Sequence, residues 1–313
     1  MHTFLFAKNP SPMPELPSDP RPHTLSLLAS QWIDYELIDS GNGQKLERYG
    51  PYTFNRPEPQ AIWNPALNEQ RWRSAHATFR PSREESGGHW EFTRPVAESW
   101  TMHYKNITFL VQTTAGRHLG VFPEQAVHWD WVSEKIRLSS HPVKVLNLFG
   151  YTGLASLSAA LAGAAVTHID ASKKALGWGK QNQALSGLED RPIRWLLDDS
   201  IKFVQREARR GVQYDGILLD PPKFGRGPKG EVWEFFEQFP QLMGACRAVL
   251  SPHPLFIVVT AYAIRASALS LYFGLQDTME EYKGEIECGE LVLEEGSANR
   301  IISSAIYARW SAI

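Results

Sequence analysis

From about residue 142 onward, short apolar segments alternate with longer segments of helical periodicity, and this alternation constrains the fold more than any other feature. We expect strands at residues 143–148, 165–169, 193–197, 214–219 and 255–260. A helix is expected after each of them, at residues 152–162, 171–185, 200–210, 231–250 and about 265–282. Two longer β segments, 284–293 and 300–310, then predict a hairpin. This order predicts an α/β fold built on a seven-stranded, mostly parallel sheet.

The first part of the chain has a different texture. Residues 1–28 are rich in Pro, Ser and Asp and predict an extended or disordered arm. Residues 29–118 predict a small β-rich accessory domain, with strand-like segments at 32–38, 90–92, 100–104 and 108–111 and a short polar helix near 65–73. The α/β domain is then expected to occupy residues 119–313.

Composition restricts the class of protein. The chain has 313 residues, 43% hydrophobic and 21% charged, and no apolar run approaches the ~20 residues that span a bilayer. The first residues lack the apolar core of a signal peptide, and the two cysteines, Cys246 and Cys288, form no disulfide framework or zinc motif. We therefore expect a cytoplasmic protein without a membrane segment or a structural metal. The net charge of −2 argues against non-specific coating of nucleic acid but allows recognition of one RNA site.

Ligands of open α/β sheets bind at the carboxyl ends of the strands, so the residues after each strand are the candidates for a site. The first expected strand leads into Asn-Leu-Phe-Gly-Tyr-Thr-Gly at residues 147–153. Gly150 and Gly153 allow a tight turn and a close approach to a ligand, and the next helix presents its amino end to a carboxylate. An ordinary turn between strand and helix is the alternative.

Acidic residues follow the next two strands. Asp170 stands where a carboxylate binds the ribose hydroxyls of an adenosine cofactor, although it is also placed to cap a helix. Asp198 or Asp199 is positioned to accept a hydrogen bond from an adenine amino group, with helix capping again the alternative.

The fourth strand runs into Asp-Pro-Pro-Lys-Phe at residues 220–224, the most specific motif of the chain. Asp220 and the proline carbonyls are suited to accept hydrogen bonds from an amino group or ring N–H of a planar base. Residues 225–230, Gly-Arg-Gly-Pro-Lys-Gly, predict a mobile basic lip suited to a phosphate backbone. A dinucleotide-binding dehydrogenase is excluded because Thr152 replaces the second glycine of the G-x-G-x-x-G fingerprint.

In this order the motifs resemble the class I S-adenosylmethionine (SAM)-dependent methyltransferases, and among them the bacterial 23S ribosomal RNA cytosine-C5 and guanine methyltransferases. The resemblance extends from about Gly120 to the end of the chain. It implies a Rossmann-like class I sheet beside the β-rich accessory domain, SAM as cofactor and ribosomal RNA as partner. The catalytic residues it implies are Asp220, Pro221, Pro222, Lys223 and Phe224. The cofactor-binding residues it implies are Phe122, Gln125, Asn147, Phe149, Gly150, Tyr151, Thr152, Gly153, Asp170, Asp198, Asp199 and Asp220.

The chain departs from the cytosine-C5 enzymes at the end of the fifth strand. Those enzymes need a cysteine nucleophile to activate carbon 5, and relatives carry one after this strand, whereas residues 258–263 read Val-Val-Thr-Ala-Tyr-Ala. Cys246 and Cys288 are expected to be packing residues. We therefore expect methyl transfer to a ring or exocyclic nitrogen.

Two other functions stay open. One is methylation of a small molecule or of a protein nitrogen, which the near-neutral charge favours. The other is a non-catalytic SAM-binding partner of RNA or of ribosome assembly, against which the intact Asp-Pro-Pro motif argues. In the accessory domain, Arg71, Arg73 and Arg80 lie among Trp72 and Phe79, a pattern typical either of unpaired-base binding or of an aromatic core with solvated arginines.

Overall fold

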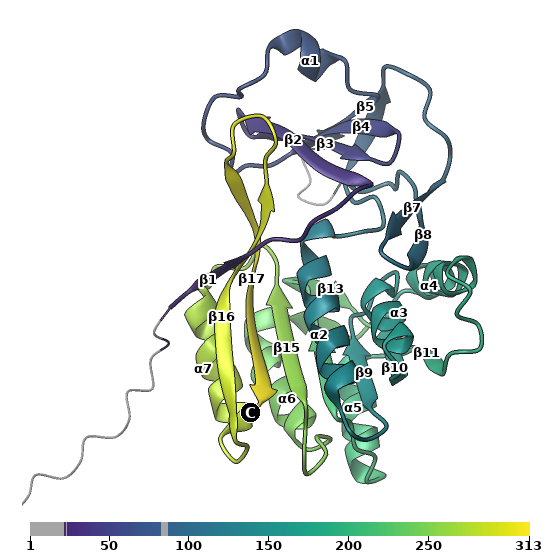
Figure 1. Cartoon of the computed structure of the whole chain (residues 1–313), viewed down its shortest axis with the longest axis vertical. Helices are drawn as coiled ribbons and strands as arrows, with labels where there is room; N and C mark the ends of the chain where they lie inside the picture. Colours follow the sequence, from purple (N-terminus) through teal and green to yellow (C-terminus); the bar gives the residue numbers. More distant parts are fainter. Residues whose placement is uncertain (1–21, 23, 83–86) are drawn as a thin grey trace, which may run out of the picture.

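The computed structural model describes residues 22, 24–82 and 87–313. Within them the main sheet has eight strands and occupies the lower half of Figure 1. Their order is β1 (Ser26–Leu28), β16 (Gly284–Glu294), β17 (Ile301–Ala312), β15 (Phe256–Ala261), β12 (Gly216–Leu219), β9 (Lys144–Leu148), β10 (Ala165–Asp170) and β11 (Ile193–Leu197). The strands from β15 to β11 are parallel to one another, and β17 is antiparallel to both of its neighbours. The predicted α/β class is confirmed, with β1 as an additional edge strand.

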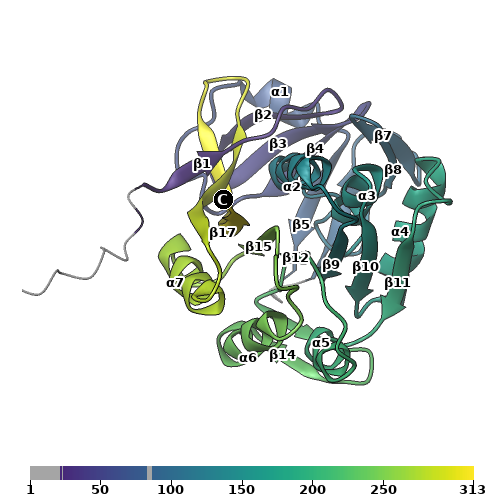
Figure 2. The same ribbon diagram turned by 60° about the horizontal axis from the view of Figure 1, so that its bottom comes forward.

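Helices cover both faces of this sheet, which explains why its central strands are apolar along their whole length. One face carries α2 (Ala126–Leu138), α3 (Leu154–Leu161) and α4 (Lys173–Leu185), and the other carries α5 (Ser200–Arg209), α6 (Phe235–Arg247) and α7 (Ala268–Met279) (Figure 2). All four residues of β12 are buried between the two layers. None of the helices in the described part of the chain is long and apolar enough to cross a membrane.

A second sheet lies above the first (Figure 1). Its order is β2 (Tyr35–Gly41), β3 (Gln44–Tyr49), β4 (Tyr52–Pro57), β5 (Ala77–Pro81) and β6 (Gly88–Phe92), and only β4 and β5 pair in parallel. Helix α1 (Glu69–Arg73) connects β4 to β5. A separate hairpin, β7 (Trp100–Tyr104) and β8 (Ile107–Val111), packs on α4, where Asn182 accepts a 2.9 Å hydrogen bond from the Leu110 amide.

One apolar cluster joins the two sheets. It includes Phe54 of the upper sheet, Trp100 of the β7–β8 hairpin, Trp129 of α2 and Leu157 of α3. The rings of Phe54 and Trp100 stack with their centroids 5.7 Å apart. The upper sheet is therefore packed against the α/β half of the chain, and its position relative to that half is defined by buried contacts.

Two local predictions differ from the structure. Most of the predicted arm lies outside the described residues, but residues 26–28 form β1 in the main sheet. The helix predicted from residue 231 begins at Phe235, and the predicted mobile lip is part of a hairpin formed by β13 (Phe224–Arg226) and β14 (Val232–Glu234). Trp233 explains the hairpin, because its buried ring donates a 2.5 Å hydrogen bond from Nε1 to the Pro222 carbonyl.

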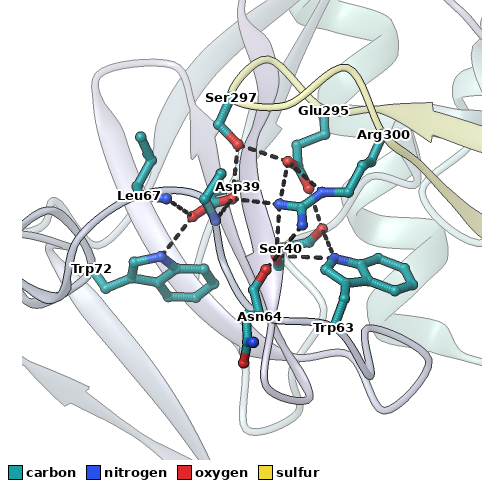
Figure 3. A network of polar contacts seen from close by, with 10 residues as sticks. Asp39, Ser40, Trp63, Asn64, Leu67, Trp72, Glu295, Ser297 and Arg300 are labelled. Carbon is teal, nitrogen blue, oxygen red and sulfur yellow. Dashed lines mark hydrogen bonds and ion pairs between the residues drawn. The ribbon is translucent and has the colours of Figure 1, made fainter.

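The tip of the β16–β17 hairpin reaches the upper sheet and is held there by a buried polar cluster (Figures 1 and 3). Arg300 of this tip contacts Asp39 Oδ1 at 3.1 Å and Glu295 Oε1 at 2.7 Å through Nη2. The Ser297 hydroxyl lies within hydrogen-bond distance of the same two carboxylates, at 2.8 Å from Asp39 Oδ1 and 2.7 Å from Glu295 Oε1. Asp39 is fully buried and Glu295 nearly so, which makes Arg300 the counter-ion of two carboxylates shielded from water.

Replacing Arg300 by Ala should destabilise the protein, because it leaves two buried carboxylates without a counter-ion. We expect the free energy of unfolding, measured by urea titration, to fall by about 2–4 kcal/mol. Arg73→Ala is the matched control, because it breaks only an exposed ion pair with Glu69 and should cost less than about 1 kcal/mol. Equal small losses in the two variants would contradict a stabilising role for the cluster.

Candidate functional site

The parallel register of the central strands brings three segments of the chain to one edge of the sheet. Leu148, the last residue of β9, pairs with Ile169 of β10 on one side and with Leu219 of β12 on the other. The residues at the ends of these strands are therefore neighbours, although up to 71 positions separate them in the sequence, from Phe149 to Asp220. They are the turn at residues 149–153, Asp170 and Asp220, as the sequence predicted.

The turn at residues 149–153 has an unusual backbone. Phe149, Tyr151 and Gly153 all have positive φ, at 58°, 51° and 82°. Residues with a Cβ rarely adopt this conformation, and such strain is found most often at functional sites. Asp170 holds the turn in place, because its Oδ2 accepts a 2.8 Å hydrogen bond from the Tyr151 amide.

Close packing explains why the first glycine of this turn, Gly150, cannot be replaced by a residue with a side chain. A Cβ at Gly150 would lie 2.3 Å from Cε1 of His168, which is buried beneath it. The neighbouring Thr152 is also fixed, since its hydroxyl donates a 2.7 Å hydrogen bond to the Gly120 carbonyl. The turn therefore lies directly against the segment that precedes α2.

Helix α3 begins immediately after the turn and lacks a side-chain cap, because its N-cap residue is Gly153. The first amides of a helix have no partner within it, and here no side chain occupies them. The positive end of the helix dipole adds to their attraction for an anion. Leu154 and Ala155, in this first turn, line a pocket at the edge of the sheet. A ligand carboxylate would be bound well at this end of the pocket.

This pocket, the cofactor pocket, encloses about 630 Å³ including the part that is open to solvent. The predicted residues that line it are Phe122, Gln125, Asn147, Phe149, Gly150, Tyr151, Thr152 and Asp220. The residues that line it without having been predicted are Val121, His128, Trp129, Val132, Leu154, Ala155, Leu218, Leu219, Val258 and Thr260. Most of the second group are apolar residues of helices and strands, which carry no motif in the sequence.

Four predicted cofactor-binding residues do not line this pocket. Gly153 is the N-cap of α3, and Asp170 accepts a hydrogen bond from the turn at the Tyr151 amide. Asp199 caps α5, where it accepts a 2.9 Å hydrogen bond from the Lys202 amide, and Asp198 is paired with Arg206. The structural alternative of helix capping thus describes Asp199, and a role in adenine binding stays a prediction for both acids.

Only part of the predicted catalytic motif, residues 220–224, lines the cofactor pocket. Asp220 lines the cofactor pocket, whereas the Pro222 carbonyl is already occupied by the Trp233 indole. Lys223 and Phe224 are exposed, and the Phe224 side chain points outward from the β13–β14 hairpin with 57% of its surface accessible. Of the acceptors predicted in this motif, Asp220 is the one that the structure brings to the pocket.

The environment of Asp220 raises the pKa of its carboxyl to about 8, chiefly because burial disfavours the charged form and secondarily because the Glu124 carboxylate is near. Gln125 works in the opposite direction, since its Nε2 donates a 3.2 Å hydrogen bond to Asp220 Oδ2. A carboxyl with a pKa near neutrality is suited to exchange a proton with a ligand at ordinary pH.

The pocket thus offers helix amides for a carboxylate, an acid for a cation or an N–H group, and aromatic and apolar walls for a ring. These are the features of an amino acid joined to a nucleoside, and they fit the SAM predicted from the sequence. His128, whose buried ring nitrogens have no hydrogen-bond partner, is a further polar group along the pocket wall.

Comparison with known proteins agrees with this geometry. The chain is 48% identical to a SAM-dependent methyltransferase from Agrobacterium tumefaciens, with a TM-score of 0.89 over 93% of this chain and 95% of that structure. A putative methyltransferase solved with SAH is 18% identical, with a TM-score of 0.68 over 90% of this chain and 76% of that one, and shows the shared fold.

Curated relatives match a shorter region. Ribosomal RNA large subunit methyltransferase K/L of Shewanella frigidimarina is 31% identical over 147 residues, which is 46% of this chain and 20% of that protein. Ribosomal RNA large subunit methyltransferase I of Klebsiella pneumoniae is 38% identical over 105 residues, 33% of this chain and 24% of that protein. This chain therefore covers about a quarter or less of these relatives.

The family model for S-adenosylmethionine-dependent methyltransferases matches residues 45–252, about two-thirds of the chain. This match includes the upper sheet from β3 onward as well as the turn at residues 149–153 and Asp220. Together with the site geometry, it establishes that the chain belongs to the SAM-dependent methyltransferase family and uses SAM as its cofactor.

Proposed function

We propose that this methyltransferase modifies a base nitrogen in structured RNA, with ribosomal RNA as the first candidate. The observation that carries the proposal is the position of Asp220, a carboxyl of raised pKa on the wall of the cofactor pocket. The matching segments of proteins named as ribosomal RNA methyltransferases support the choice of RNA. A small molecule or a protein nitrogen is the alternative acceptor.

The positions of the two cysteines support nitrogen over carbon 5 as the acceptor. Cys246 lies in α6 and is fully buried in the core, where burial raises the pKa of its thiol to about 12, and Cys288 is buried in β16. Neither lines the cofactor pocket. A thiol held protonated and away from the pocket is not a nucleophile for a base, so a cysteine-dependent C5 mechanism has no suitable residue here.

When bound, SAM would supply the electrophilic methyl group that is transferred to a base nitrogen. Asp220 accepts the proton that the base nitrogen loses, and its raised pKa matches that task near neutral pH. Gln125 orients the Asp220 carboxylate through their hydrogen bond. The turn at residues 149–153 and the first amides of α3 would hold the carboxylate end of the cofactor, so positioning would supply much of the rate.

Asp220→Ala should abolish methyl transfer while leaving SAM binding nearly intact. Loss of the proton acceptor is expected to lower kcat by about 10²–10⁴-fold. SAM affinity, measured by calorimetry, should stay within about threefold of wild type because the other pocket residues remain. Asp190→Ala, which removes an exposed acid outside the pocket, is the control. Retained activity in Asp220→Ala would show that another group accepts the proton.

Asp220 should also lower stability at high pH. Its folded-state pKa is about 8 against an ordinary value of 3.8, so the unfolded chain releases this proton first, and stability is lost as pH rises from about 4 to 8. Asn carries no such proton. The free energy of unfolding of Asp220→Asn, measured by urea titration, should therefore gain on that of wild type by on the order of 1 kcal/mol per pH unit between about pH 5 and pH 8. A margin independent of pH would contradict the raised pKa.

The identity of the methyl acceptor is tested by incubating the enzyme and methyl-labelled SAM with RNA from a strain that lacks this gene. A labelled nucleoside, identified by mass spectrometry and present in wild-type RNA, would support the proposal and name the modified atom. The same reaction with assembled ribosomal subunits covers acceptors that need folded RNA. Label confined to a protein or metabolite fraction would replace RNA with that acceptor.

A further inference from the structure

A second pocket of about 490 Å³, including the part that is open to solvent, lies between the upper sheet and the main sheet, beside the cofactor pocket. Its lining includes Arg117, His118, Phe122, Glu124, Tyr262 and Ser304. Phe122 lines both pockets, as does Val121, so the two spaces share one wall. A molecule in the second pocket therefore lies next to the cofactor.

The shared wall is aromatic. The Phe122 ring centroid is 4.9 Å from that of His118 and 5.1 Å from that of Tyr262 within the second pocket. On the cofactor side it is 5.8 Å from that of Tyr151. Burial, together with the nearby arginines, lowers the pKa of His118 to about 3, so its ring is neutral at ordinary pH. Three adjacent neutral rings are suited to a planar, aromatic ligand.

Two hydroxyl groups of the second pocket lack a hydrogen-bond partner of normal geometry. The hydroxyl oxygens of Tyr262 and Ser304 are buried and make no hydrogen bond of normal geometry, although the Tyr262 hydroxyl lies beside the Gln125 side chain and the Glu124 carboxyl. Leaving a buried hydroxyl without a partner costs about 1–3 kcal/mol, so such groups are usually satisfied by a ligand or water. Together with Glu124 they offer acceptors and donors to the edge of a ring.

Glu124 connects this pocket to Asp220. Its side chain is 5% exposed, and it is adjacent in sequence to Gln125, the hydrogen-bond partner of Asp220. Its charge is also one of the causes of the raised pKa of Asp220, so the two carboxyls lie within electrostatic reach of each other. A ring edge held by Glu124 is therefore near the group that we propose accepts the proton.

The rim of the second pocket carries one cation without an ion-pair partner among the described residues. Lys45 pairs with Glu58 at 3.4 Å, and Arg56 pairs with Glu47 at 2.7 Å. Arg117 is exposed and forms no ion pair within the described part of the chain. An exposed, unpaired guanidinium beside an aromatic pocket is suited to a phosphate group.

We propose that the second pocket receives the base to be methylated, as part of a nucleotide flipped out of its RNA strand. The base lies against Phe122 and Tyr262, presents an amino or ring N–H edge to Glu124, Tyr262 and Ser304, and places its phosphate at Arg117. This assignment rests on the proposed RNA substrate. It gives a role to four side chains that the cofactor does not need.

The test measures binding of the four nucleoside 5′-monophosphates by saturation-transfer NMR, with SAH present to fill the cofactor pocket. One variant combines Tyr262→Phe, which removes the first hydroxyl, with Ser304→Leu, which replaces the second hydroxyl by a larger apolar side chain. The other variant is Arg117→Ala alone. Tyr282→Phe and Arg94→Ala, which lie outside the second pocket, are the matched controls. SAH affinity and melting temperature report whether each variant is folded.

We expect wild type and controls to bind at least one nucleotide, and the double variant to bind it roughly tenfold or more weakly with unchanged SAH affinity. Arg117→Ala should weaken binding of the nucleotide but not binding of the corresponding nucleoside, which has no phosphate. Should the double variant misfold, Tyr262→Phe alone, with an expected loss of about threefold to tenfold, decides the question. Nucleotide binding that these variants leave unchanged, or no binding by wild type, would overturn the assignment.

The same variants separate this assignment from the proposed function. Nucleotide binding that depends on Tyr262 and Ser304, combined with no methyl transfer from wild-type enzyme to RNA, would contradict the RNA substrate and leave the second pocket as a nucleotide site. Methyl transfer to RNA that is unchanged in the double variant would leave the proposed function standing and place the target base elsewhere.

Discussion

The site depends above all on the parallel register of β9 with β10 and β12, which aligns the ends of three strands at one edge of the sheet. That alignment lets Asp170 reach the Tyr151 amide and places Asp220 on the opposite side of the same turn. A strained turn needs such support, because two residues with a Cβ are held at positive φ. Burial of the strands on both faces by α2–α4 and α5–α7 keeps the register from slipping, so packing far from the pocket determines its shape.

Much of this arrangement could be predicted from sequence, because it follows from local patterns. Alternating strands and helices predict the parallel sheet, and the rule that ligands bind after the strands then selects the turn at residues 149–153, Asp170 and Asp220. The Asp-Pro-Pro motif likewise points to Asp220, which lines the pocket. These predictions depend only on short segments whose structure is determined by neighbours in sequence.

Other features depend on contacts between distant segments and could not be predicted in this way. The segment predicted as a loop and the start of a helix instead forms the β13–β14 hairpin, in which Trp233 donates a hydrogen bond to the Pro222 carbonyl. The pockets require residues from α2, β15 and the upper sheet to meet, and the upper sheet is positioned by a cluster in which Arg300 contacts Asp39 across 261 positions. Sequence alone gives no register for such contacts, and a carboxylate after a strand, such as Asp199, looks the same whether it caps a helix or binds a ligand.

The upper sheet lies beside Glu124, one of two acids near the cofactor pocket whose burial lowers the stability of the protein. Burial raises the pKa of both Glu124 and Asp220, and the Glu124 carboxylate raises that of Asp220 further, which lowers stability unless a ligand compensates. Enzymes keep such groups where the reaction needs a carboxyl that ionises near neutral pH. The upper sheet contributes Lys45 and Arg56 to the lining of the second pocket beside Glu124, so residues far from Asp220 in sequence surround the acid whose charge raises the pKa of Asp220.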